Sequence, residues 1–510
     1  MVHLTPPSGW MNDPNGLVHH DGTWHAFYQH EPEALVWGPM HWGHAVSRDL
    51  LTWEHRPIAL VPDGLGQIFS GSAVVDHDGS AGCGAGALLA FFTYHRDGDR
   101  GQGLAWSRDG GLTWTKHPDN PVLPAPGDGP DFRDPRVLRY EDDRGASWWV
   151  MVVAAGAVLR FYRSDDLLAW TPTSTLAGLP GADGGVVETP ELLELELALP
   201  EAGLPGGERS DTEAPGPVAP GRRTARQRAW VLVIGVNAGG PNGGSGARYL
   251  VGHFDGERFS PTDADTEVRW VDHGADLYAL QAWSGVPDGR RIWVGWMSNW
   301  AYANEVPATT WRGMLSIPRE VRLVRDDAGL PVLSQRPVRE LDGGRTTLVE
   351  LHGAELAAAR AAIADVDGPC LDVRLLLEFP PAATGELALR VHAHREVDPA
   401  GGASAPSGTR VSYDPVTRQV VLDRSRSGTE VAPGFPTVHR STPLPARDRL
   451  DLRILTDTCS VEVFAADGTV VLSDLVLPAP DATGIRIDRL PVGARILHLD
   501  VGRLAGGGAR

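Results

Sequence analysis

Three acidic side chains stand in short sequence contexts that suit acid–base or nucleophilic chemistry. Asp13 lies within an Asn-Asp-Pro-Asn-Gly run, Asp134 directly follows Arg133, and Glu188 follows the apolar Val187. Partial burial behind Val187 would favour the protonated form that a general acid needs. Such groups could hydrolyse a glycosidic bond: one carboxylic acid protonates the leaving oxygen, and one carboxylate attacks the anomeric carbon or activates water.

Each acid also has a simpler interpretation when it is taken alone. The residues of the 12–16 run all favour turns, so an isolated copy would predict a turn. The 133–135 segment could be an ion pair in a turn before proline. Glu188 has two neighbouring acids, Glu191 and Glu194, which we expect to be solvated. The three acids therefore gain meaning only if the fold brings them together.

The elements that would position these acids are strands. Short runs rich in Val, Ile, Trp, Phe and Tyr, at 23–28, 88–94, 148–153 and 230–234, alternate with Gly, Pro, Asn and Asp turns. Amphipathic helical periodicity is nearly absent. The pattern predicts an all-β protein.

A repeat underlies the strand pattern. The segments 47–53, 107–114 and 164–170 share a Ser-x-Asp pair, a short turn and a Trp, and they recur at a spacing of about 60 residues. Roughly 320 residues divided by that period predicts a five-bladed β-propeller. Because a propeller places the inner strand of each blade at a common axis, acids from separate blades can meet in one funnel.

The composition changes after residue 323, where segments such as 371–377 alternate apolar and polar residues. This alternation predicts a C-terminal β-sandwich with one solvated face on each sheet. The predicted organisation is a propeller at 1–325, a linker at 326–345 and a sandwich at 346–510. We interpret the Pro-, Gly- and charge-rich residues 195–228 as a flexible insertion between two strands, and 354–363 as a short helix or an irregular start of the sandwich.

Composition and charge exclude several functional classes. The 510 residues are 42% hydrophobic and 22% charged, and no apolar run is long enough to span a bilayer. A formal charge of −19 argues against nucleic acid and favours a neutral, polyhydroxylated ligand. The absence of a leader in the sequence as written predicts a cytoplasmic protein, or a secreted one if a leader has been removed.

Neither a disulfide framework nor a metal site is expected from the sequence. Cys83, Cys370 and Cys459 are scattered without CxxC spacing, so we expect free thiols. His41 and His44 stand three residues apart, but the surrounding aromatic residues favour packed strands over a ligand pair. We therefore expect no metal and no cofactor.

Further motifs follow one another along nearly the whole chain, and together they resemble glycoside hydrolase family 32. They include Phe27-Tyr28-Gln29, Phe69-Ser70-Gly71-Ser72 and Trp296-Met297-Ser298-Asn299-Trp300, besides the segments around the three acids. The other motifs are Trp37 to Ala45, Asp272 to Ala279, Trp311-Arg312-Gly313 and, in the C-terminal part, Ser460 to Phe464.

The resemblance implies a role for each acid. Asp13 would be the nucleophile, Glu188 the general acid/base, and Asp134 a stabiliser of the transition state that binds fructose hydroxyls. The chemistry would then retain anomeric configuration, with the Asp13 and Glu188 carboxyl groups about 5 to 5.5 Å apart. Asp276 and Tyr278 are weaker candidates for the rim. The residues implied for the fructose subsite are Asn12, Gln29, Trp37, Phe69, Ser70, Arg133 and Trp300.

Two positions depart from the family pattern. Thr189 follows the acid/base glutamate where the family usually has cysteine, and Glu31-Pro32 stands where Asn-Pro is common, which would place an extra negative charge near the entrance. Neither change removes a catalytic group. Both bear on substrate preference and on the pH optimum.

The resemblance predicts an exo-acting β-fructosidase that hydrolyses terminal fructose from levan or inulin, with sucrose as an additional substrate. The segment 298–303 is more similar to fructan-degrading members than to sucrases. A fructosyltransferase using the same residues is the alternative. A non-catalytic fructan-binding propeller would lack one of the three acids, and an inverting arabinan furanosidase would lack the Asn-Asp-Pro-Asn-Gly and Phe-Ser-Gly-Ser motifs.

Overall fold

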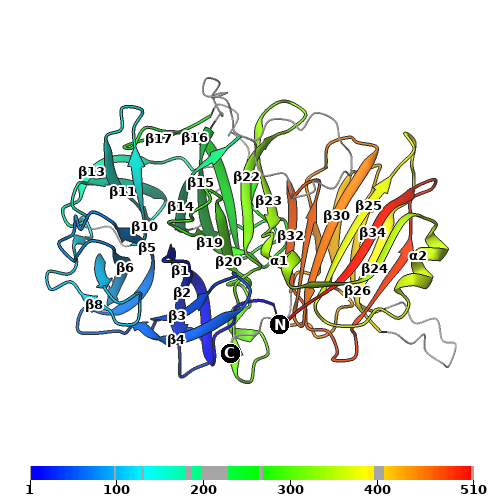
Figure 1. The fold of residues 1–510 in the computed structure, drawn as a ribbon, viewed down its shortest axis with the longest axis horizontal. Helices are drawn as coiled ribbons and strands as arrows, with labels where there is room; N and C mark the ends of the chain where they lie inside the picture. The colour runs from blue at the N-terminus through cyan, green and yellow to red at the C-terminus, as the bar shows by residue number, and fades with distance from the viewer. Residues whose placement is uncertain are drawn as a thin grey trace.

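The computed structural model describes residues 2–96, 99–127, 131–179, 186–197, 228–262, 268–394, 407–432 and 435–506. In this part of the chain almost all regular structure is β. Five N-terminal sheets surround one axis, and two C-terminal sheets pack face to face beside them (Figure 1). The predicted five-bladed propeller followed by a β-sandwich is confirmed. Within the described ranges, no helix has the length and apolar character needed to cross a membrane.

Each propeller blade is an antiparallel sheet whose first strand lies at the axis. The first blade contains β1 (Gly9–His20), β2 (Thr23–Glu31), β3 (His41–Ser47), β4 (Trp53–Leu60) and the added β21 (Trp311–Arg312). The second contains β5 (Gln67–Asp76), β6 (Ala87–Arg96), β7 (Asp99–Ser107), β8 (Thr115–Lys116) and β9 (Leu123–Pro124). The third contains β10 (Phe132–Glu141), β11 (Ser147–Ala155), β12 (Val158–Ser164) and β13 (Thr171–Leu176).

The last two blades follow the same plan. The fourth contains β14 (Val186–Glu196), β15 (Arg228–Asn237), β16 (Ser245–Phe254), β17 (Phe259–Pro261) and β18 (Arg269–Trp270). The fifth contains β19 (Tyr278–Ala282), β20 (Ile292–Trp296), β22 (Arg319–Arg325) and β23 (Pro331–Pro337). A 3-10 turn, η1 (Ala303–Glu305), lies between β20 and β21.

The Ser-x-Asp repeat forms the turn between the third and fourth strands of the first three blades. In every copy the serine hydroxyl donates to the aspartate two residues later, and the aspartate also accepts backbone N–H groups of the turn. The Oγ to Oδ1 distances are 3.0 Å for Ser47 and Asp49, 2.7 Å for Ser107 and Asp109, and 3.0 Å for Ser164 and Asp166. The repeat that predicted the blades is therefore a side-chain turn motif.

The inner strands close into a ring. β1 contacts β5, β5 contacts β10, β10 contacts β14, β14 contacts β19, and β19 returns to β1. The closure is strengthened by β21, which arrives late in the chain and pairs in parallel with β1, Gly9 opposite Trp311. Apolar side chains fill the space between blades, as where Phe91 and Met151 share one buried cluster.

The sandwich consists of a six-stranded and a five-stranded sheet. The larger sheet contains β24 (Arg345–Ala354), β34 (Arg495–Leu504), β25 (Leu371–Glu378), β30 (Arg449–Asp457), β31 (Ser460–Ala465) and β32 (Val470–Leu475). The smaller contains β29 (Val438–Arg440), β28 (Gln419–Asp423), β27 (Thr409–Asp414), β26 (Leu387–Ala393) and β33 (Gly484–Arg489). One buried cluster, which includes Val373, Leu389 and Val463, fills the space between the sheets.

Three predicted segments can be compared with these strands. The predicted linker at 326–345 contains β23 and the short helix α1 (Glu340–Gly343). Because β23 pairs with β22 along its whole length, it is the outer strand of the fifth blade. Residues 354–363 mostly form the helix α2 (Leu356–Ile363). The insertion 195–228 connects paired strands, Glu196 opposite Arg228, and its residues 198–227 lie outside the described residues. The division at 325 and 345 stays a prediction.

Buried charges join the two domains. Arg319 of the fifth blade is fully buried, and its guanidinium contacts the sandwich carboxylate Glu462 at 2.5 Å. His3 binds Asp457 at 2.9 Å and Glu462 at 2.8 Å. Burial alone would lower the pKa of His3, but these two carboxylates raise it to about 9. Since a buried charge without a partner is costly, the propeller and the sandwich depend on each other for stability.

Candidate active site

A β-bulge interrupts each inner strand near its start. The pairing register shifts between Met11 and Pro14 in β1, and at the equivalent positions of β5, β10, β14 and β19. A bulge inserts one extra residue and redirects neighbouring side chains. Three of the five bulges contain a non-glycine residue with positive φ, Asp134 at 62°, Thr189 at 46° and Ala279 at 51°. The bulges turn side chains from several blades toward the axis, and the candidate acids lie in or beside them.

Asp13 is held by side chains of two blades. Ser70 of β5 donates its hydroxyl to Asp13 Oδ2 at 2.7 Å, and the Asn12 amide donates to Asp13 Oδ1 at 3.0 Å. The Asn12 carbonyl in turn accepts the Trp10 indole N–H at 2.7 Å. Asn12 therefore fixes the nucleophile candidate in one orientation, with both ends of its own amide engaged.

Asp134 lies beside Glu188 because the bulges of β10 and β14 meet. The backbone N–H of Thr189 donates to Asp134 Oδ2 at 2.9 Å, and the Asp134 N–H donates to the Thr93 hydroxyl at 2.9 Å. Arg133 Nε stands 3.9 Å from Asp134 Oδ2, which is too long for a hydrogen bond but close enough for attraction between charges.

Glu188 is held between two donors from other blades. Arg133 Nη2 donates to Glu188 Oε1 at 2.7 Å, and the Tyr278 hydroxyl donates to Oε2 at 2.5 Å. Arg133 is itself oriented by Asp131, 2.8 Å from its Nη1. The side chain of Glu188 retains 18% exposure, so one of the three acids stays open to solvent. The carboxylate of blade four is thus bound by one donor from blade three and one donor from blade five.

Burial changes the protonation of the other two acids. Desolvation raises the pKa of Asp13 to about 6, although hydrogen bonds from Ser70 and Asn12 lower it, and the charge of Glu188 adds to the rise. Desolvation likewise raises the pKa of Asp134 to about 7, against the attraction of Arg133. Repulsion among three neighbouring carboxylates makes simultaneous ionisation costly. Near neutral pH the site can therefore combine an ionised carboxylate with a protonated one.

Aromatic side chains flank the acids. Trp37, which is 42% exposed, meets Phe69 edge to face with ring centroids 5.9 Å apart. On another side, the partly buried Trp300 stacks on Trp10 at 5.9 Å, next to Asn12. Gln29 is buried and donates to the Ile68 carbonyl at 3.0 Å, directly before Phe69. Flat apolar faces beside fixed polar groups suit a sugar ring.

Several expectations for single residues are wrong. Asp276 does not lie at the rim: it is fully buried and contacts Arg424 of the sandwich at 2.6 Å. Glu191 is also buried, 2.8 Å from Arg136, although we expected it to be solvated. Glu31 is buried and accepts the Glu33 N–H at 3.0 Å, and its effect on substrate preference stays a prediction.

Thr189, the departure from the family pattern, makes no hydrogen bond through its hydroxyl, which is buried. Its backbone N–H binds Asp134, so its contribution to the site is made by the main chain. Gly235 of β15 pairs with the preceding residue, Glu188, and a Cβ atom at 235 would stand 2.8 Å from the Thr189 hydroxyl and 2.9 Å from the Tyr278 ring. The absence of a side chain at 235 gives both groups their space.

Three contributors to the site differ from the sequence-based expectations. Tyr278 was expected at the rim, yet it is buried in the site and bonded to Glu188. Asp131 stands outside the predicted site, although an acid two residues before Arg133 could indicate a second partner for the guanidinium. Thr93 gave no signal, because its position depends on the pairing of β5 with β6.

Comparisons with known proteins agree with this geometry. The chain matches the model described as glycosyl hydrolases family 32 N-terminal domain over residues 3–337, and that described as glycosyl hydrolases family 32 C terminal over 340–494. It is 40% identical over 507 residues to a levanase of Bacillus subtilis (strain 168), covering 98% of this chain and 69% of that protein. It is 32% identical over 538 residues to an extracellular exo-inulinase of Aspergillus awamori, covering 95% and 90%.

Solved structures show the same two-domain fold. A crystal structure of exo-inulinase from Aspergillus awamori matches with a TM-score of 0.82 at 30% identity, over 99% of this chain and 98% of that one. A fructofuranosidase from Schwanniomyces occidentalis complexed with fructosylnystose matches with a TM-score of 0.81 at 27% identity, over 99% and 97%.

Proposed function

Because the chain belongs to glycosyl hydrolases family 32, we propose that it is a retaining, exo-acting β-fructosidase. It hydrolyses terminal β-D-fructofuranosyl residues of fructans such as levan and inulin, and also sucrose. The names of the levanase and exo-inulinase relatives support a fructan substrate and action at the chain end. The observation that carries the proposal is the convergence of Asp13, Asp134 and Glu188, from three blades, at distances where the charges of the three carboxylates interact.

In the first step Asp13 acts as the nucleophile and Glu188 as the acid. Glu188 gives its proton to the glycosidic oxygen, the bond between that oxygen and the anomeric carbon breaks, and Asp13 forms a new bond to the carbon. Asp134, whose pKa is raised to about 7, can donate a hydrogen bond to a fructose hydroxyl while protonated. Such contacts accelerate the reaction where they strengthen in the transition state.

In the second step Glu188, now ionised, removes a proton from water, and the resulting hydroxide displaces Asp13 from the anomeric carbon. Two inversions give net retention. Tyr278 and Arg133 act on Glu188 in both steps, because each holds one of its carboxyl oxygens.

A fructosyltransferase would use the same first step and replace water with a sugar acceptor. Nothing in the site favours that outcome over hydrolysis. The products decide between the two: free fructose indicates hydrolysis, and oligosaccharides longer than the substrate indicate transfer.

The test is a time course on levan, inulin and sucrose in parallel, with chromatography of the products. We expect free fructose from the earliest time points, without intermediate-length oligomers, and NMR should show the β-anomer forming first. Glu188→Gln should lower fructose release by about 10² to 10⁴-fold, and Asp13→Asn by at least as much.

The matched control is Asp326→Asn, because within the described residues this partly exposed aspartate accepts turn N–H groups, an interaction that asparagine preserves. It should release fructose at the wild-type rate. Near-wild-type rates in Asp13→Asn or Glu188→Gln would contradict the site, and an inverted first product would contradict the nucleophile alone.

A further inference from the structure

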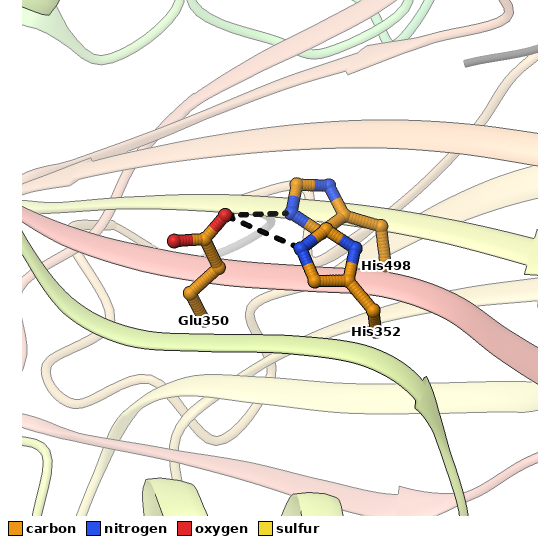
Figure 2. A group of neighbouring side chains, drawn as sticks. All are labelled: Glu350, His352 and His498. Carbon is orange, nitrogen blue, oxygen red and sulfur yellow. Dashed lines mark ion pairs between the residues drawn. The ribbon is translucent and has the colours of Figure 1, made fainter. Parts of the chain in front are cut away.

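A cluster of three potential metal ligands lies on the sandwich domain, away from the acids of the propeller. Glu350 and His352 belong to β24, an edge strand, and His498 belongs to the adjacent β34 (Figure 2). His352 and His498 are direct partners in the antiparallel register. Residues two apart on a strand share a face, so Glu350 lies on the same face as His352.

The cluster occupies the outer face of the six-stranded sheet. The alternate residues Leu351, Leu499 and Val501 pack into the core of the sandwich, which leaves the three ligand candidates on the opposite side. The side chains of His352 and Glu350 are 70% and 53% exposed, whereas that of His498 is 33% exposed. An ion from solvent can therefore reach the cluster.

The three donor atoms point toward one another. Glu350 Oε1 stands 3.4 Å from His352 Nε2 and 3.8 Å from His498 Nε2, as the dashed lines of Figure 2 show. The two imidazole rings stack with centroids 4.6 Å apart and an angle of 12° between their planes. All ligand atoms lie within 4.8 Å of one another. Bonds of about 2.0 to 2.2 Å around a tetrahedral ion place ligand atoms about 3.4 Å apart, so small rotations would complete the site.

One donor of the cluster lacks a hydrogen bond. His498 Nε2 is buried, and Glu350, at 3.8 Å, is too far away to accept from it. The neighbouring strand β25 places the apolar Leu376 opposite His498. Asp500, which stands opposite Glu350, is engaged with Arg345 at 2.6 Å. A bound ion would give His498 Nε2 the partner that these neighbours do not provide.

We propose that Glu350, His352 and His498 form a binding site for a divalent transition metal of the zinc class. Two imidazoles and one carboxylate match the ligands of Zn²⁺ and its first-row neighbours, whereas Mg²⁺ and Ca²⁺ prefer oxygen. Water would occupy the fourth position. The ion connects the edge strand β24 to β34 and stabilises the folded sandwich by mass action. The sequence alone predicted no metal, because His352 and His498 are distant in the chain and meet only through strand pairing.

The test uses the full-length chain without a histidine tag, stripped with a chelator. Equilibrium dialysis against ZnCl₂ and thermal unfolding with and without ZnCl₂ are compared for wild type, His352→Gln, His498→Gln and the control His394→Gln. His394 belongs to the same domain and pairs with Asp481 at 3.3 Å. We expect wild type and the control to bind one more equivalent of Zn²⁺ than His352→Gln or His498→Gln, with at least a tenfold affinity difference. Only the first two should gain Tm from zinc.

A second measurement identifies the ligands of the ion directly. Electron paramagnetic resonance of the wild-type chain with one equivalent of Cu²⁺ should show splitting from two imidazole nitrogens, reduced to one in either histidine variant. Equal zinc binding by wild type and His498→Gln would overturn the proposal. So would a zinc-induced Tm rise that all variants share, and the triad would then be held by ion pairs alone.

Discussion

At the scale of single residues, Asp13 and Ser70 show how the site controls protonation. Ser70 donates to the carboxylate of Asp13, whose pKa burial raises to about 6, so loss of the hydroxyl should raise that pKa further. The nucleophile must be ionised, and kcat/KM should fall as the pH drops through about 6. In Ser70→Ala this acid limb should move upward by about one pH unit, since a hydrogen bond to a charged group is worth about 1.5 kcal/mol.

Full pH profiles of kcat/KM measure this shift. Ser72→Ala is the control on the same strand, because the Ser72 hydroxyl binds the backbone of Pro135 and Val137 and does not contact Asp13. Its acid limb should stay in place. An unchanged or lowered limb in Ser70→Ala would show that the hydroxyl does not stabilise the ionised nucleophile.

The catalytic acids of the site could be predicted from the sequence, but many of the contacts between side chains could not. Asp13, Asp134 and Glu188 each stand in a short, contiguous sequence motif that can be recognised without the structure. The structure brings all three together. Asp276 also stands in a sequence motif, yet it contacts Arg424, a residue of the other domain. Contacts between side chains of the two domains depend on how the domains pack. A short sequence motif does not specify that packing.

At the scale of elements, the blades were predictable and their bulges were not. The Ser-x-Asp turns share a sequence motif that repeats along the chain. The register shifts of the inner strands arise from strand pairing and share no sequence motif. The fourth blade shows the consequence: Glu188 and Thr189 sit in its bulge opposite Gly235, which must lack a side chain for Tyr278 to reach Glu188.

Gly235→Ala should therefore lower kcat by about tenfold or more with little loss of Tm, since only one hydrogen bond to Glu188 is displaced. Tyr278→Phe removes the same bond directly, so the two changes should be less than additive when combined. Gly343→Ala, at a position with open space, is the control and should keep full activity. Full additivity in the double variant would mean that the glycine acts elsewhere.

At the scale of the whole molecule, buried charges determine stability. Arg319→Ala removes the guanidinium from the buried Glu462 and Asp272, leaves Glu462 with His3 alone, and should destabilise the chain by about 3 to 5 kcal/mol. Arg322, on the same strand, also reaches the sandwich through Asp467, but both side chains are partly exposed, so Arg322→Ala should cost about 1 kcal/mol or less. Denaturant unfolding of both variants measures the difference. Equal losses would contradict the role assigned to the buried pair.

The two-domain plan followed from composition and repeat length, but the dependence of one domain on the other did not. The change of composition after residue 323 predicted a boundary near 325 to 345, and within these residues β23 pairs with β22 of the fifth blade. Similarly, His3 gave no sign that it would bind Glu462 at the far end of the sequence. Long-range contacts of this kind require the folded chain.

The parallel pairing of β1 with β21 also orders events during protein synthesis. Asp13 leaves the ribosome early, but its strand gains its last hydrogen-bonding neighbour only when Trp311 and Arg312 emerge. Tyr278, which holds the acid/base, arrives shortly before them. A nascent chain that stops before residue 311 therefore lacks the strand that strengthens the closure of the ring, and we expect ribosome-bound intermediates to gain activity only after that point.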